Sequence, residues 1–79
     1  MNQPVKLNGV EVWAYMVEQD SGFQIRLSLD DWDRCRLHRG ERISLRRPGR
    51  REEWFFLAEL MEAPPFATFA LTNRVRIAS

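Results

Sequence analysis

The sequence predicts a mainly β domain: a small antiparallel barrel or strongly twisted sheet of SH3-like or OB-like size, with one short helix. Apolar residues alternate with polar ones along several short segments, which is the pattern of half-buried strands. Turn-forming pairs separate these segments at short intervals. The 79 residues leave room for one core, so residues 1–79 are expected to form a single domain.

Three strands are predicted in the N-terminal third of the chain. Asn8-Gly9, the commonest signal for a two-residue hairpin, separates a short edge strand at 5–7 from a strand at 10–17. A polar turn then leads into a strand at 23–29, in which apolar residues occupy every second position. We expect the inward side chains of this strand to be Phe23, Ile25, Leu27 and Leu29.

A short helix is predicted within residues 30–39. Asp30 is a good N-cap, and acidic residues in the first turn and arginines in the last complement the helix dipole. Gly40 suits the left-handed residue that commonly ends a helix. Trp32 and Leu37 are then expected to face the sheet.

The second half of the chain predicts a hairpin and two further strands. A strand at 42–46 leads into the turn Arg47-Pro48-Gly49-Arg50, and the return strand follows at 53–61. Pro64 and Pro65 end that strand because neither can donate to a ladder, and apolar strands resume at 66–71 and 74–77. The inward residues expected in this half include Ile43, Leu45, Val75 and Ile77.

Two of the predicted strands are apolar on both faces, which a sheet with one wet face does not explain. Something must cover the outer residues, and a homodimer or other homo-oligomer is the commonest solution. A heterologous partner, or coverage by the helix and terminal strands, stays open as an alternative. The residues expected at a partner interface are Trp13, Tyr15, Val17, Trp54 and Phe55.

Positive charge is concentrated in the middle of the chain. The formal net charge is only +1, but residues 31–51 hold eight arginines against three acidic residues, a local charge of +5. Arginine guanidinium groups match phosphate and carboxylate oxygens bidentately, so a tight turn that gathers them predicts an anion site. The candidate ligands are Arg42, Arg46, Arg47, Arg50 and Arg51.

Nucleic acid, bound without sequence preference, is the first partner this pattern suggests. Exposed aromatic residues would add stacking surfaces for bases, and the candidates are Trp13, Tyr15, Phe66 and Phe69. The alternative is that the arginines pair with Glu52 and Glu53 on a solvated surface, or reflect a bias toward arginine in a chain with one lysine.

Residues for catalysis or metal binding are sparse. Cys35 and His38 lie three apart in the predicted helix, but no third group accompanies them as a nucleophilic site requires. Asp31 and Asp33 belong to a run that lacks the glycine and distal glutamate of a calcium loop. We therefore expect no enzyme activity, no cofactor and no metal.

The sequence thus predicts a small binding module, with an interaction or structural subunit lacking a nucleic-acid role as the alternative. One cysteine cannot form an internal disulfide, which is typical of a reducing cytoplasm. No apolar run approaches the length of a membrane span, and the N-terminal residues do not resemble a secretion signal. A cytoplasmic location is the expectation.

Overall fold

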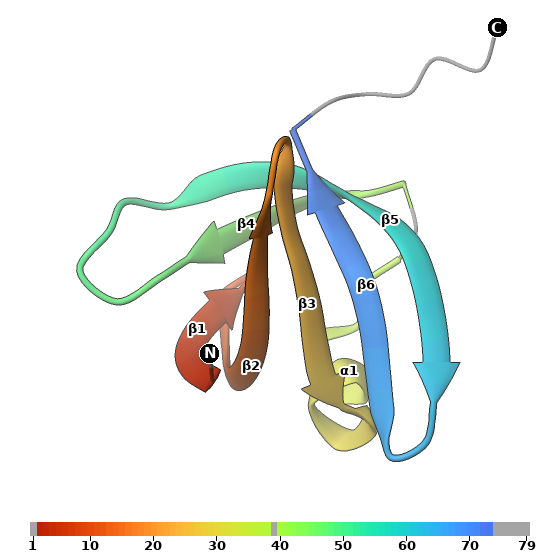
Figure 1. Cartoon of the computed structure of the whole chain (residues 1–79). Coiled ribbons are helices and arrows are strands. Elements are labelled where there is room, and N and C mark those ends of the chain that lie inside the picture. Colours follow the sequence, from red (N-terminus) through yellow and green to blue (C-terminus); the bar gives the residue numbers. More distant parts are fainter. Residues whose placement is uncertain (1, 39, 74–79) are drawn as a thin grey trace, which may run out of the picture.

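The computed structural model describes residues 2–38 and 40–73, which form a closed six-stranded barrel with one helix (Figure 1). The strands follow the order β1-β2-β3-β6-β5-β4 around the barrel, and every neighbouring pair is antiparallel. This confirms the predicted fold class and selects the barrel over the open sheet. The elements are β1 (Asn2–Leu7), β2 (Val10–Gln19), β3 (Gly22–Ser28), α1 (Leu29–Cys35), β4 (Arg42–Arg46), β5 (Glu53–Ala63) and β6 (Phe66–Thr72).

Both predicted tight turns are confirmed by their backbone geometry. Asn8 and Gly9 have φ angles of 49° and 82°, the left-handed pair that a two-residue hairpin between right-twisted strands requires. At the other turn the Arg50 amide donates to the Arg47 carbonyl at 3.1 Å, and Gly49 has a φ of 73°. These turns set the β1–β2 and β4–β5 registers.

The inward residues of the strands fill the barrel, as strict alternation predicts. The predicted residues Phe23, Ile25, Leu27, Ile43 and Leu45 are all buried together, whereas Leu29 is partly buried and packs against them. The predicted strand at 74–77, with Val75 and Ile77, lies outside the described residues. The rest of the buried apolar set is Val5, Leu7, Val12, Ala14, Met16, Trp32, Cys35, Leu37, Phe55, Leu57, Ala67, Phe69 and Leu71.

The helix begins and ends earlier than the sequence predicts. Ser28, still in extended conformation with ψ of 153°, is the N-cap, and its hydroxyl accepts from the Asp31 amide at 3.2 Å. The C-cap is Arg36 (φ 51°, ψ 47°) rather than a residue beside Gly40. Asp30 therefore lies in the first turn, where its charge suits the helix dipole without capping it.

The short helix closes one end of the barrel against β2, β3 and β6 (Figure 1). Trp32 and Leu37 are buried, as predicted, and the Trp32 ring lies 5.2 Å from that of Phe69, centroid to centroid. One end of the barrel is therefore filled by side chains rather than left open as a ligand cavity.

Two expectations about strand position are wrong. Phe55 does not face outward: it is buried and meets Phe23 edge to face, with ring centroids 5.7 Å apart. The run of four apolar residues in β5 simply alternates, so Phe55 and Leu57 fill the core. The first strand is not an edge either, because β1 pairs with both β2 and β4. Its pairing with β4 extends over only two residue pairs.

Candidate nucleic-acid interface

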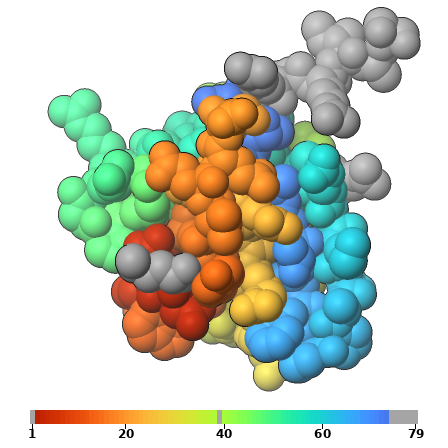
Figure 2. Space-filling view, viewed as in Figure 1, coloured from red at the N-terminus to blue at the C-terminus, as the bar shows by residue number. Residues whose placement is uncertain are grey.

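The outer surface of β1, β2, β3 and β6 carries a continuous set of exposed side chains (Figure 2). Strand register fixes their order: Lys6 lies opposite both Glu11 and Arg46, Pro4 lies opposite Trp13, and Tyr15 lies opposite Arg26. We give the name outer strip to six of these side chains, Lys6, Pro4, Trp13, Tyr15, Arg26 and Phe66; the exposed carboxylate of Glu11 lies on the same surface, opposite Lys6.

A pocket opens beside the outer strip, where β1 and β4 part. Because only Lys6 and Leu7 pair with β4, the N-terminal part of β1 diverges from the β4–β5 hairpin and leaves a pocket of about 270 Å³. This is slightly smaller than most small-molecule sites. Three cationic side chains and one carboxylate reach it, so it suits one anionic group. The lining residues are Pro4, Val5, Lys6, Glu11, Arg46, Arg47, Pro48 and Gly49.

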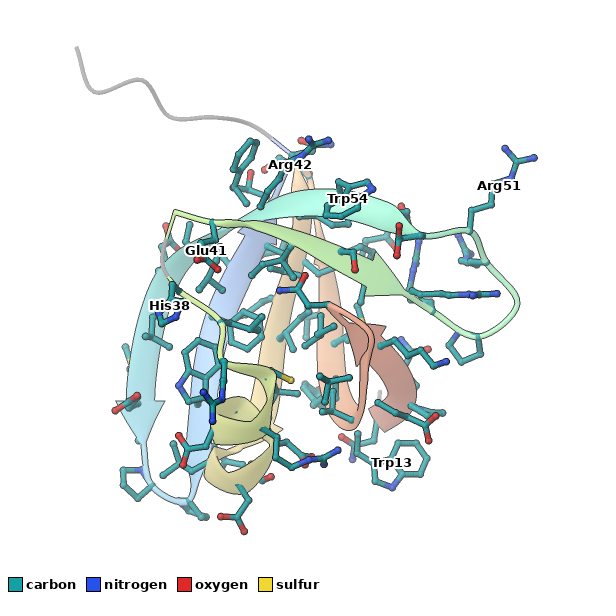
Figure 3. All side chains as sticks on the ribbon, turned by 180° about the vertical axis from the view of Figure 1, so that it is seen from behind. Trp13, His38, Glu41, Arg42, Arg51 and Trp54 are labelled. Atoms are coloured by element: carbon teal, nitrogen blue, oxygen red, sulfur yellow. The ribbon has the colours of Figure 1, made fainter. Side chains whose placement is uncertain are left out.

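Three of the predicted arginines remain available at the hairpin, which projects from the barrel beside β1 (Figure 2). Arg46, Arg50 and Arg51 are exposed and form no ion pair with any described residue. Arg51 is directed away from the barrel into solvent (Figure 3). Their charges are therefore free to act on an incoming anion.

Arg47 differs from these three because it is mostly buried and ion-paired, although its buried Nε has no hydrogen-bond partner within the described residues. Its side chain is only 14% exposed, and its Nη2 donates to Oε1 of Glu53 at 2.6 Å. The guanidinium also lies 4.7 Å from the centre of the Phe23 ring. Of the five candidate arginines, Arg47 is thus the one that pairs with a neighbouring glutamate, as the alternative interpretation of the arginines predicts. This ion pair stabilises the base of the hairpin.

Arg42 lies apart from the hairpin arginines. It begins β4, four residues before Arg46, and its guanidinium lies over the Trp54 ring at 5.1 Å (Figure 3). Neither residue lines the pocket. The structure therefore brings four of the five predicted anion ligands to the hairpin and leaves Arg42 with Trp54.

Exposed aromatic and aliphatic residues of β2 lie on the outer face, as the alternation predicts. Trp13 is 65% exposed, with Tyr15 and Val17 at 39% and 41%. Phe66 is also exposed, at 41%, whereas Phe69 is buried and cannot stack on a ligand. The largely exposed indole of Trp13 offers a surface on which an unpaired base can stack.

Sequence reasoning missed Arg26 and Lys6 as members of this surface. The Arg26 guanidinium lies 4.9 Å from the centre of the Tyr15 ring and 4.9 Å from that of Phe66. Alternation in β3 does place Arg26 outward, but its neighbours come from β2 and β6, and their pairing leaves no local signal in the sequence.

The cysteine and histidine do not form a reactive pair. Cys35 is buried, and burial together with the negative charge of Asp31 raises the pKa of its thiol to about 11. A thiol of this kind carries almost no thiolate at neutral pH, and His38 is exposed. Within the described residues, no three side chains of the ligating types His, Cys, Asp and Glu are grouped to hold a metal ion.

Comparisons with protein-family models, curated proteins and solved structures find no match to this chain. Across residues 2–38 and 40–73, no helix has the length and apolar character needed to cross a membrane.

Proposed function

We propose that this domain binds single-stranded nucleic acid without sequence preference. In this proposal Lys6, Arg46, Arg50 and Arg51 contact phosphates, and Trp13 stacks on a base. Contacts from arginine and lysine to the phosphates of a nucleic-acid backbone supply affinity, but they do not discriminate between bases. A protein aromatic ring accepts any base, since every base has a π face.

The observation that supports the proposal is the continuity between the charged pocket and the aromatic surface. Pro4 lines the pocket and lies opposite Trp13 in the β1–β2 register, so the two chemistries adjoin. A backbone in the pocket can therefore direct its next bases onto Trp13. Positive charge that tracks a backbone, next to rings that accept bases, is the common arrangement for general single-strand binding.

The direct test is titration of fluorescently labelled oligonucleotides at low salt. The triple variant Arg46→Gln, Arg50→Gln and Arg51→Gln should weaken binding, and the slope of log affinity against log salt should fall by about 2, since each phosphate contact on a single strand contributes about 0.7. The matched control is Arg42→Gln, an exposed arginine apart from the pocket, which should behave as the unmodified protein. A folded protein that binds no oligonucleotide at low salt would rule the function out.

A second candidate function, self-association through the outer face, rests on the exposure of Trp13, Tyr15 and Val17. An apolar patch of this kind on a small barrel can meet its own copy across a two-fold axis. Sedimentation at micromolar concentration separates the candidates. A dimer that Trp13→Glu dissociates without unfolding favours self-association, whereas a monomer throughout favours the nucleic-acid proposal.

A further inference from the structure

We propose that Arg26, held between Tyr15 and Phe66, is a second phosphate contact at the far end of the outer strip from the hairpin. This inference rests on the proposed function and extends it. The nucleic acid would be held at two points, the hairpin pocket and Arg26, with a base on Trp13 between them. Two such points with an exposed ring between them specify a single strand rather than a duplex, whose bases remain stacked on one another.

The first argument is the way the arginine is held. Its guanidinium lies 4.9 Å from the centres of two rings, contributed by β2 and β6 on either side of β3. Contact with two rings restricts the rotamers of a long side chain, so less conformational entropy is lost when it binds. A stacked guanidinium can still donate from its edge, in the forked geometry that a phosphate accepts.

The second argument is that Arg26 has no acceptor of its own. Arg34 donates to Asp31 at 2.8 Å and to the Glu11 carbonyl at 3.2 Å, and Arg47 donates to Glu53. By contrast, no hydrogen bond or ion pair joins Arg26 to any described residue, although it is exposed. Its strand neighbours across the sheet, Tyr15 and Thr68, carry no charge. A cation that is held in place but has no ion pair is suited to an external anion.

The third argument is spacing. Lys6 lies on β1 and Arg26 on β3, the two strands that flank β2. Across the sheet, Lys6 lies opposite Glu11 of β2 and Arg26 lies opposite Tyr15 of β2. Four residues along a strand and two strand spacings across the sheet separate them by about 16 Å. Trp13 lies between Glu11 and Tyr15 on β2 and is 65% exposed. This separation spans several nucleotides of an extended strand, so we expect a minimal site of about 4, at the low end for small barrels.

The experiment compares Arg26→Gln with the control Arg42→Gln, which removes another ring-stacked, exposed arginine. For oligothymidylates longer than the minimal site, Arg26→Gln should lower the salt slope by about 0.7 and weaken affinity several-fold at low salt. Dinucleotides reach only one of the two points, so the loss should be smaller for them. Arg26→Lys keeps the charge and should retain the salt slope. Duplex DNA of the same length should bind more weakly to the unmodified protein and should not distinguish the variants.

Several outcomes would overturn this inference. If the unmodified protein binds long oligonucleotides and Arg26→Gln binds them equally well, the second contact is absent while the proposed function stands. If no oligonucleotide binds, both fail. If Arg26→Gln alters only self-association, the stack of Arg26 on Tyr15 and Phe66 contacts a second copy of the protein rather than a phosphate. Should the variant not fold, the Arg26 Nε–H NMR signal of the unmodified protein decides, because it must shift when a long oligothymidylate is added.

Discussion

The two sides of β2 have the same apolar character and opposite environments. Val12, Ala14 and Met16 point inward and are buried, whereas Trp13 and Tyr15, from the same strand, remain exposed. Closure of the barrel determines the difference, because its interior accepts one face of each strand. Burial therefore explains the apolar character of the inner residues through stability. The apolar character of the outer residues needs another explanation, and the proposed binding of nucleic acid offers one.

The largest loss of stability should come from a substitution of a residue that faces the barrel interior. Leu27 is 1% exposed at the centre of the core, so Leu27→Ala should destabilise the domain by about 2–5 kcal/mol through lost transfer energy and a cavity. Denaturant unfolding measures this. A loss below about 0.5 kcal/mol, the size typical of surface substitutions, would show that the inner face does not supply the stability.

The close backbone contact between β3 and β6 at Gly22 gives the next largest expected loss of stability. A Cβ at Gly22 would lie 1.9 Å from the Leu71 carbonyl oxygen, an atom of the backbone of β6 that cannot move aside alone. Gly22→Ala should therefore destabilise the barrel by about 1–3 kcal/mol, the range of overpacking. The control Gly49→Ala meets no atom within 4 Å, although its φ of 73° adds backbone strain. A Gly22→Ala variant as stable as the unmodified protein would contradict the β3–β6 register.

Trp13→Ala should separate stability from binding on the outer side. With Trp13 mostly in solvent, the free energy of unfolding should change by no more than about 0.5 kcal/mol. Oligonucleotide affinity should fall by about 1–3 kcal/mol through the lost base stack. Val17→Ala is the control, since it removes an outer apolar side chain without a ring. If Trp13→Ala unfolds the protein, the outer side of β2 also supports the fold, and the distinction between its two sides is wrong.

The helix cap should give a smaller effect. The Ser28 hydroxyl accepts from the Asp31 amide, and Ser28→Ala should cost about 1 kcal/mol of stability. Asp30→Ala, at the residue that the sequence suggested as the cap, should cost less. Thermal unfolding of the two variants compares them directly, and the reverse order would restore Asp30 as the cap.

Cys35 should have no effect on the pH dependence of stability near neutrality. The folded pKa of its thiol is about 11, above the ordinary value of 9.0, so the folded state favours the protonated thiol. Its contribution is complete below pH 9 and is lost as pH rises from 9 through 11. Cys35→Ala should remove that part of the alkaline decline in unfolding free energy. A native thiol that reacts rapidly with alkylating reagents at pH 7 would contradict this assignment.

The sequence predicts the faces of most strands because a period of two is a local property. Alternation correctly placed Phe23, Ile25 and Leu27 inside and Trp13 outside. It failed for Phe55, since an unbroken apolar run contains no alternation from which to read a face. The helix start was misplaced because Ser28 and Asp30 are both good caps, and only the end of β3 decides between them.

The candidate site was only partly predictable, for a different reason. The basic hairpin is contiguous in sequence, so its arginines were found. The stack around Arg26 joins residues from three strands, and the β3–β6 pairing that brings Phe66 near is long-range. The ion pair of Arg47 depends likewise on which glutamate the strand register places beside it, and the sequence alone does not distinguish Glu52 from Glu53.

Amide chemical-shift mapping by NMR, with a short oligothymidylate added to the labelled protein at low salt, tests most directly whether the outer face binds a single strand. The shifts should concentrate on Lys6, Trp13, Tyr15 and Arg26 and on the turn from Arg46 to Arg51, with little change in α1. The indole N–H of Trp13 should shift more than that of Trp54. Shifts confined to the helix, or no shifts with a folded protein, would contradict the assignment of this face as the nucleic-acid surface.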